Sequence, residues 1–204
     1  MLEEKDTYKT IEIPSEEVLY KEKNSKFFGY CFPVHSEEEV KLILDKIKKQ
    51  HFSARHWCYA FQLGTEQVHY RANDDGEPSG SAGLPIYGQI QSFELTNILV
   101  VVVRYFGGVK LGVGGLVTAY KETTKMALEN AQIIEKTIDI HYTIGFEYRE
   151  MNRVMRVIKE KNLNIIGQKL EMDCQIEIAV RKKEAQQVFD IFQAMYEVKI
   201  SEKE

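Results

Sequence analysis

The stretch "NILVVVVRYF", Asn97 to Phe106, constrains the fold most, because it is an almost unbroken apolar run. Such a run is typical of a strand that is buried on both faces at the centre of a sheet. The glycine-rich stretch "GGVKLGVGG" follows, and then come residues at the spacing of one helix face: Val113, Leu116, Val117, Tyr120, Thr124, Leu128 and Ala131. The sequence therefore predicts a central strand, a glycine loop and a long helix.

The residues before this run predict an α+β domain. Ser36 and Glu39 have the spacing of a capping box and open an amphipathic helix. Three stretches are strand-like because aromatic and β-branched residues dominate them: 25–34, 56–63 and 68–72. The "GTEQ" between the last two favours a hairpin. A Gly- and Pro-interrupted segment that extends to about Phe93 favours a further helix.

From Thr137 onward the pattern becomes strand, helix, strand, strand, helix, strand. This βαββαβ order predicts a ferredoxin-like domain, in which an antiparallel sheet carries two helices on one face. We therefore predict an α+β protein of two domains, 1–135 and 136–204. Three arginines at helical spacing, Arg149, Arg153 and Arg156, are either a contact face for RNA or protein or, as Glu150 and Glu160 among them favour, a solvated face.

Composition limits the classes of partner. The net charge of −4 gives no global attraction for nucleic acid, so any such binding depends on a local patch. The three cysteines, Cys31, Cys58 and Cys174, are far apart and are interpreted as reduced thiols. No apolar run approaches the roughly 20 residues that span a bilayer, and the N-terminus lacks a signal pattern. We therefore expect a cytoplasmic protein with no membrane contact.

The glycine loop is a candidate phosphate site. Its glycines are Gly107, Gly108, Gly112, Gly114 and Gly115. Glycine lets a backbone approach a ligand closely, and free N–H groups at a helix start favour an anion. Arg104 and Lys110 flank the glycines, but the spacing is not that of a P-loop. The alternative is that the glycines only permit tight packing and that both cations are solvated.

The stretch "NDDGEPSGSAG", Asn73 to Gly83, is the second candidate site. Asp74, Asp75 and Glu77 are able to share Mg²⁺ or, with His56, to divide acid and base roles. Against this, Asp-Gly and Glu-Pro are common turn dipeptides. We predict a turn without metal or cofactor, and keep catalysis by His56, Asp75 or Glu77 as the alternative.

Three stretches together resemble the IMPACT family, also called the YigZ family: "ARHWCYAF" at 54–61, "DDGEPSGSAG" at 74–83 and "VVVVRYFGGVKLGVGGLVTAY" at 100–120. The family motif falls on His56, Asp74, Asp75, Gly76, Glu77, Pro78, Gly80, Ala82, Gly83, Arg104, Tyr105, Gly107, Gly108, Lys110, Leu111, Gly112, Gly115 and Tyr120. The resemblance implies an N-terminal IMPACT domain with a ribosomal-protein-like fold and a C-terminal domain similar to one in elongation factor G.

These observations favour a translation-associated regulatory protein that is not an enzyme. We expect it to bind RNA, the ribosome or a translation factor in a cleft between the "DDGEP" turn and the "RYFGGVKLG" loop. Arg104, Lys110 and the loop amides would contact phosphate, while Asp75 and Glu77 anchor the loop or contact Arg104. One alternative is a hydrolase or transferase acting on a phosphorylated or nucleotide substrate. Another is a protein-interaction module using the ferredoxin-like sheet. The sequence leaves the oligomeric state open.

Overall fold

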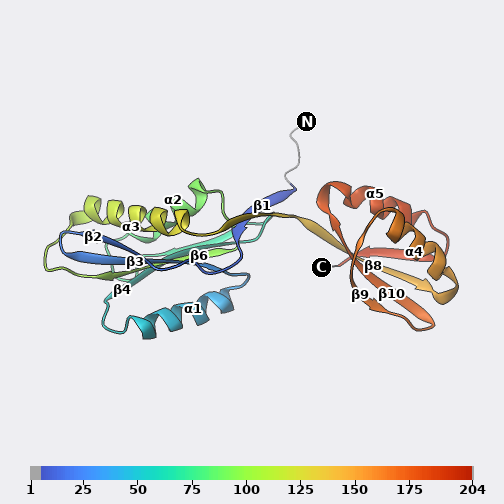
Figure 1. Cartoon of the computed structure of the whole chain (residues 1–204), viewed down its shortest axis with the longest axis horizontal. Coiled ribbons are helices and arrows are strands. Elements are labelled where there is room, and N and C mark those ends of the chain that lie inside the picture. Colours follow the sequence, from blue (N-terminus) through green and yellow to red (C-terminus); the bar gives the residue numbers. More distant parts are fainter. Residues whose placement is uncertain (1–5, 204) are drawn as a thin grey trace. The chain divides into compact units, whose positions relative to one another are not determined.

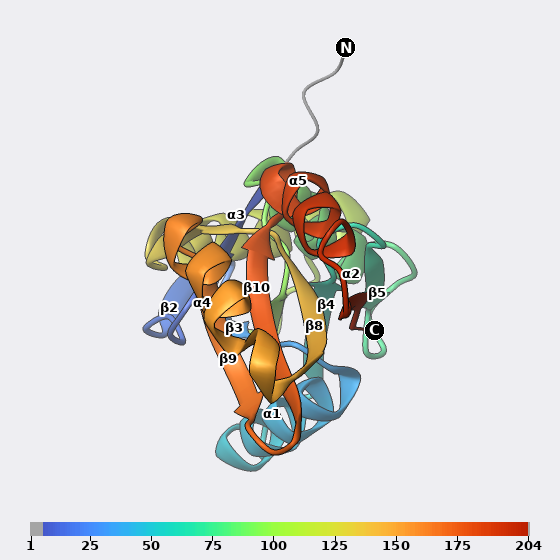
Figure 2. The ribbon, with the colours of Figure 1, turned by 90° about the vertical axis from the view of Figure 1, so that its right-hand side faces the viewer.

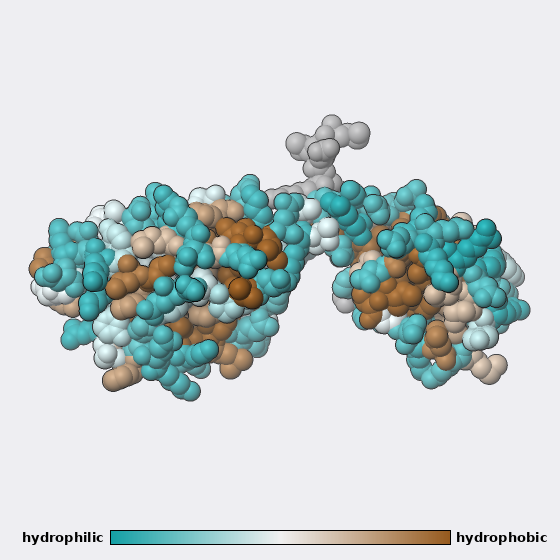
Figure 3. All heavy atoms as spheres, in the orientation of Figure 1, coloured by the Kyte–Doolittle hydropathy of each residue, from teal (hydrophilic) through white to brown (hydrophobic). Residues whose placement is uncertain are grey.

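The structure is a computed structural model that describes residues 6–203 of the chain. Two compact units make up the fold. One comprises Tyr8–Lys136, and the other comprises the described residues from Thr137 to Lys203 together with Asp6 and Thr7. The sequence predicted two domains, 1–135 and 136–204. It stays a prediction that each of them folds by itself. Hydrophilic residues cover much of the face of each unit drawn in Figure 3, with apolar patches between them.

The N-terminal unit is built on a five-stranded sheet whose neighbouring strands are all antiparallel. In spatial order its strands are β2 (Val18–Glu22), β3 (Ser25–Pro33), β6 (Ile98–Tyr105), β4 (His56–Leu63) and β5 (His69–Asn73). The apolar run of the sequence is therefore the middle strand, as predicted. Every residue of β6 from Ile98 to Arg104 is buried.

Helices cover both faces of this sheet (Figure 1). They are α1 (Glu37–Gln50) on one face, and α2 (Gly83–Ser92) and α3 (Gly112–Glu129) on the other. Val100 and Val102 of β6 belong to the core beside α2 and α3, whereas Val101 and Val103 belong to the core beside α1. The central strand is continuously apolar because alternate side chains point into two different cores.

The start of α1 is set by its cap, as the spacing of Ser36 and Glu39 predicts. The Glu39 backbone N–H donates to Ser36 Oγ at 3.2 Å. In return, Glu39 Oε2 accepts the backbone N–H of His35 at 2.7 Å, one residue earlier than in a standard capping box. Two amide groups at the helix start are satisfied in this way.

Some elements differ from the prediction. The short strands β1 (Thr7–Ile11) and β7 (Ile133–Thr137) form a two-stranded ribbon, and neither was predicted as a separate strand. Val113 was placed on the buried face of α3 but is 56% exposed. The reason is that the residues on both sides of it, Gly112 and Gly114, are exposed as well, so the first turn of the helix has no core to face.

The C-terminal unit is ferredoxin-like, as predicted. Its antiparallel sheet has the spatial order β11 (Val198–Glu202), β8 (Asp139–Glu147), β10 (Asp173–Arg181) and β9 (Asn164–Lys169). A short 3-10 helix, Tyr148–Glu150, leads into α4 (Met151–Glu160), and α5 (Lys182–Gln193) precedes β11. Both α-helices contribute to one apolar core with the sheet, and Figure 2 shows them packed against it.

Two further observations concern composition. Cys31, Cys58 and Cys174 are free and buried, and burial raises the pKa of the Cys31 thiol to about 12. Within residues 6–203, no helix is long and apolar enough to cross a bilayer.

Candidate functional site

The acidic stretch forms a tight turn after β5. The backbone N–H of Glu77 donates to the carbonyl oxygen of Asp74 at 3.0 Å. Between them, Asp75 and Gly76 have φ angles of 43° and 86°. Two consecutive left-handed residues are the signature of a type I′ turn, for which Asp-Gly is a favoured sequence. The local chemistry of the dipeptide thus fixes the direction in which Glu77 leaves the turn.

Asp74 organises the rest of the stretch. Its Oδ2 accepts the backbone N–H of Gly80 at 2.8 Å, and its Oδ1 accepts those of Ala82 and Gly83 at 2.9 and 2.8 Å. The N-cap of α2, Ala82, has no side chain that makes a cap hydrogen bond, so Asp74 supplies the acceptor from eight residues away. A carboxylate at this end also interacts favourably with the helix dipole. Asp74 is therefore committed to the fold.

Asp75 ties the turn to the beginning of β4. Its Oδ2 accepts the backbone N–H of Trp57 at 2.7 Å, and its carbonyl oxygen lies 2.9 Å from His56 Nδ1. Because a carbonyl oxygen only accepts, Nδ1 must carry the proton of this hydrogen bond. His56 is thereby held in one tautomer next to the turn.

Glu77 joins two elements, β6 and α3, at a single oxygen. Its Oε1 lies 2.7 Å from Arg104 Nη1 on β6 and accepts the Tyr120 hydroxyl of α3 at 2.9 Å. Cys58 Sγ of β4 lies 3.2 Å from the same hydroxyl. Burial, together with the neighbouring Cys58 and Glu77, raises the pKa of Tyr120, so the phenol keeps the proton that it donates. The turn is locked to the sheet and to α3.

Arg104 lies against two aromatic rings. Its guanidinium carbon lies 5.5 Å from the ring centroid of Phe27 and 5.6 Å from that of Phe106. The side chain is buried, and Nε has no hydrogen-bond partner among the described residues. Its charge is matched by Glu77, so the guanidinium does not face an incoming phosphate. This arrangement favours a positioning role for Arg104 over the phosphate contact predicted from the sequence.

The glycine loop has a packed beginning and an open remainder. A Cβ on Gly107 would lie 2.1 Å from the backbone carbon of Asn24, and the backbone N–H of Gly107 donates to Ser25 Oγ at 3.1 Å. The loop therefore lies directly against the turn between β2 and β3. Gly115 also packs tightly, because an added Cβ would lie 3.1 Å from the Leu111 side chain.

The open part of the loop leads into α3. Gly108 and Gly112 have φ angles of 87° and 73°, the left-handed region that glycine adopts most readily. Added Cβ atoms at Gly108, Gly112 and Gly114 would meet nothing within 4 Å. The N-cap of α3, Leu111, makes no side-chain cap. Gly107 and Gly115 thus serve tight packing, whereas Gly108, Gly112 and Gly114 lie at an open surface. Phosphate binding by the loop stays a prediction.

The predicted site residues separate into two groups. Glu77, Arg104 and Tyr120 converge in a buried cluster, to which Asp74 and Asp75 are tied through backbone contacts. Lys110 lies instead on the exposed loop and has no ion pair among the described residues. No group of three His, Cys, Asp or Glu side chains in the described chain has the arrangement of a metal site.

A hollow beside the glycine loop was not predicted from the sequence. It has a volume of about 310 Å³ and is lined by Asn24, Lys26, Phe28, Tyr105 and Phe106. The signal was the alternation in "SKFFGY", which places Lys26 and Phe28 on one face of a strand. The register that brings Tyr105 opposite Lys26 was not visible in the sequence.

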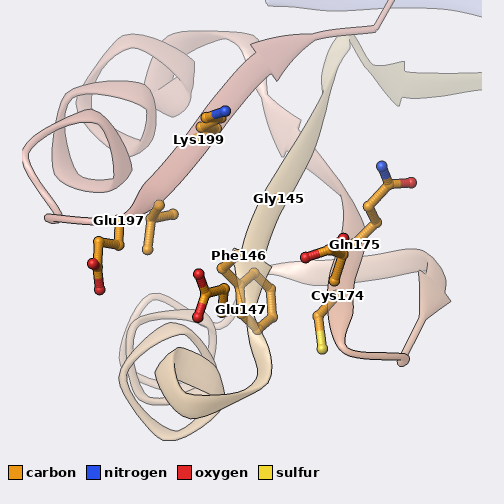
Figure 4. Close-up of a pocket in the computed structure, with 9 residues that line it drawn as sticks. Gly145, Phe146, Glu147, Cys174, Gln175, Glu197 and Lys199 are labelled. Carbon is orange, nitrogen blue, oxygen red and sulfur yellow. The ribbon is translucent and has the colours of Figure 1, made fainter.

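A larger hollow of about 600 Å³ lies in the C-terminal unit (Figure 4). Glu147, Asp173 and Glu197 line it, with Lys199 and Gln175. Outside the lining, Arg149 lies between two of these carboxylates, 3.2 Å from Glu147 and 2.6 Å from Glu197. Acidic groups dominate this hollow, which is unfavourable for a phosphate backbone.

The arginines of the following helix are also paired. Arg153 contacts Glu150 at 2.6 Å, and Arg156 contacts Glu160 at 2.9 Å. The sequence left two interpretations open, and these pairs favour the second, a solvated helix face on which arginines alternate with glutamates. The α4 surface therefore offers no unpaired arginine cluster to an anion.

The region of the chain that contains the site matches a known protein family. The family model "Impact N-terminal domain" matches residues 23–128, which contain all the residues of the buried cluster and the glycine loop. The chain is 32% identical to IMPACT family member YvyE of Bacillus subtilis over 178 residues, covering 87% of this chain and 82% of that protein.

Two further comparisons extend over most of the chain. IMPACT family member YigZ of Escherichia coli is 33% identical over 149 residues, covering 71% of this chain and 72% of that protein. A solved structure described as a crystal structure of a hypothetical protein has a TM-score of 0.72 at 26% identity, and covers 98% of both chains. The two-unit fold is thus shared with an experimentally determined structure.

Proposed function

This chain belongs to the IMPACT family, and from that premise we propose that it is a translation-associated protein that binds RNA. The surface that we assign to binding is the open loop from Phe106 to Gly115 with the adjacent turn between β2 and β3. The observation that carries this proposal is a group of unpaired lysines on that surface: Lys23, Lys26 and Lys110. All three are exposed, and none has an ion pair among the described residues.

The contrast with the C-terminal unit supports this choice. There, the arginines of the α4 region each have a glutamate within ion-pair distance. A cation that already has a carboxylate partner gains less from a phosphate than one that has only water around it. Local, unpaired positive charge also reconciles RNA binding with a net charge of −4.

In this proposal the acidic turn positions the binding surface and does not react. Glu77 holds Arg104, and Arg104 stacks against Phe106 at the start of the loop. The alternative, a hydrolase or transferase, needs a carboxylate available to a substrate. Of the three candidates, Glu77 is occupied by Arg104 and Tyr120. Asp75 Oδ2 accepts the backbone N–H of Trp57, and His56 Nδ1 donates to the carbonyl oxygen of Asp75. We therefore propose no reaction at this site.

The proposal is tested by titrating fluorescently labelled RNA at about 50 and 200 mM salt, because each phosphate contact adds to the salt dependence of binding. A Lys26→Ala, Lys110→Ala double variant should bind more weakly and show a shallower salt slope. The matched control is Lys159→Ala, Lys161→Ala, which removes two exposed lysines from the C-terminal unit. Equal affinity of the two double variants would refute the assigned surface.

A translation role adds a second expectation. The protein should cosediment with ribosomal particles from a cell extract, and the Lys26→Ala, Lys110→Ala variant should do so less than the control variant. If RNA binding depends on these lysines but ribosomal particles are not bound, the RNA part of the proposal stands and the ribosomal part fails.

A further inference from the structure

We propose that the hollow lined by Lys26, Phe28, Tyr105 and Phe106 is a stacking site for an unpaired base, so that the RNA bound here is single-stranded. This inference rests on the proposed function and deepens it, because RNA binding through lysines alone would not distinguish single strands from duplexes.

The register of the sheet creates the hollow. Lys26 of β3 lies directly opposite Tyr105 of β6, and Phe28 lies two residues further on the same face of β3. The rings of Phe28 and Tyr105 are 5.6 Å apart at an interplanar angle of 77°. A volume of about 310 Å³ is at the lower end of ligand pockets. It suits one flat ring and is too small for a peptide helix.

Phe106 forms an exposed wall of this hollow. Its side chain is 46% exposed, and Arg104 lies against its ring at 5.6 Å. Arg104 is itself held by Glu77 in the buried cluster. The ring is therefore supported from inside the protein while it remains accessible from solvent. A wall fixed before binding loses little conformational entropy when a ligand stacks on it.

The charges around the hollow favour a nucleic-acid strand. Close packing of Gly107 against Asn24 brings the loop that carries Lys110 beside the turn that carries Lys23. Lys26 lines the hollow itself. Proteins bind single strands by combining aromatic side chains, on which the bases stack, with cations that follow the nucleic-acid backbone. In a duplex the bases are already stacked on one another and cannot reach such rings.

The first test compares a labelled single-stranded RNA of about 10 nucleotides, within the length range that one such site covers, with a duplex of the same sequence. Wild-type protein should prefer the single strand. Phe106→Ala should weaken single-strand binding by about 5- to 150-fold, the range expected for loss of one stacked base. The duplex affinity and the salt slope should hardly change. Val68→Ala is the matched control, since Val68 is an apolar residue that is 50% exposed and lies outside the assigned surface.

The second test needs no variant. RNA that contains 2-aminopurine at one position should lose fluorescence on binding, because stacking on an aromatic ring quenches this base. A free mononucleotide at the same nucleotide concentration should compete poorly, because it lacks the neighbouring phosphates that contact the lysines. Effective competition by the mononucleotide would overturn the proposal that a strand binds here, and would indicate a small-molecule ligand instead.

The outcomes separate the two proposals. Salt-dependent binding of equal strength to single strand and duplex, unchanged in Phe106→Ala, would overturn the stacking site and leave the proposed function intact. Absence of RNA binding by the wild type would overturn both. Thermal unfolding of Phe106→Ala, measured in parallel, shows whether its loss of contact with Arg104 affects the fold. If the substitution does affect the fold, the 2-aminopurine measurement on the wild-type protein decides whether a base stacks at this site.

Discussion

Arg104 Nη1 lies 2.7 Å from Glu77 Oε1, and the side chains are only 7% and 4% exposed. This buried ion pair connects the central strand of the sheet to the acidic turn. Such pairs add little net stability relative to apolar replacements, but removal of one partner leaves an uncompensated buried charge. The pair therefore makes the position of the turn strongly dependent on both residues.

Glu77→Ala should destabilise the protein by about 3–5 kcal/mol, because it leaves Arg104 buried without a counter-charge. Urea unfolding of the full chain measures this change. A Glu77→Ala, Arg104→Met double variant should lose less stability than the sum of the two single variants, since it removes both charges. Additive losses would contradict the coupling between these two residues.

Asp74→Ala should cost about 3 kcal/mol or more, because the carboxylate accepts three backbone N–H groups and hydrogen bonds to charged groups are worth more than neutral ones. The same urea measurement applies. Asp45→Ala, at an exposed position of α1, controls for the loss of one negative charge. Hydrogen exchange at the start of α2 should increase in the Asp74 variant and remain unchanged in the control.

Gly107→Ala should destabilise the protein, because the added Cβ would meet the backbone of Asn24 at 2.1 Å and overpacking of this kind typically costs about 1–3 kcal/mol. Gly114→Ala is the matched control. It adds the same methyl group seven residues later in an open position, where nothing lies within 4 Å. The two variants should differ clearly in thermal unfolding temperature, and equal temperatures would show that the loop does not pack as described.

The stability of the protein should decrease as the pH falls, because His51 takes up a proton. Burial lowers the pKa of His51 below its usual value of 6.5, and the ring contacts the hydroxyl groups of Tyr30 and Tyr105. The unfolded chain therefore takes up the proton first as the pH decreases. Full stability is present above pH 6.5 and is lost as the pH falls through the lower pKa of the folded state.

The measurement is the thermal unfolding temperature between about pH 8 and pH 5, the interval that brackets an ordinary histidine pKa. His51→Gln removes the titrating group but keeps a side chain that forms hydrogen bonds. The variant should show a smaller decrease over this interval than the wild type. Other titrating groups, including Glu17 near Tyr30, are common to both proteins, so the difference between the two curves reports His51.

The sequence predicted elements whose signals are local. Continuous apolar character placed 97–106 at the centre of a sheet, and the Ser36 and Glu39 spacing placed the start of α1. The order of strand-like and helical stretches after Thr137 predicted the ferredoxin-like unit. The motifs of the acidic turn and the glycine loop indicated the family. Each of these depends on residues within a few positions of one another, where backbone preference and hydrophobic period are readable.

Only the tertiary structure decided what the charged and aromatic residues contact. The sequence offered both Asp75 and Glu77 as partners of Arg104, and the fold pairs Arg104 with Glu77, 27 positions away. This pairing places the arginine inside the protein and not in contact with phosphate at the surface. Lys26 meets Tyr105 through the register of β3 and β6. A shift of one residue in that register would turn either side chain to the opposite face. Registers between distant strands are set by the packing of the whole core. The sequence therefore predicted the acidic turn as an anchor, whereas the atoms that make its contacts followed from the fold.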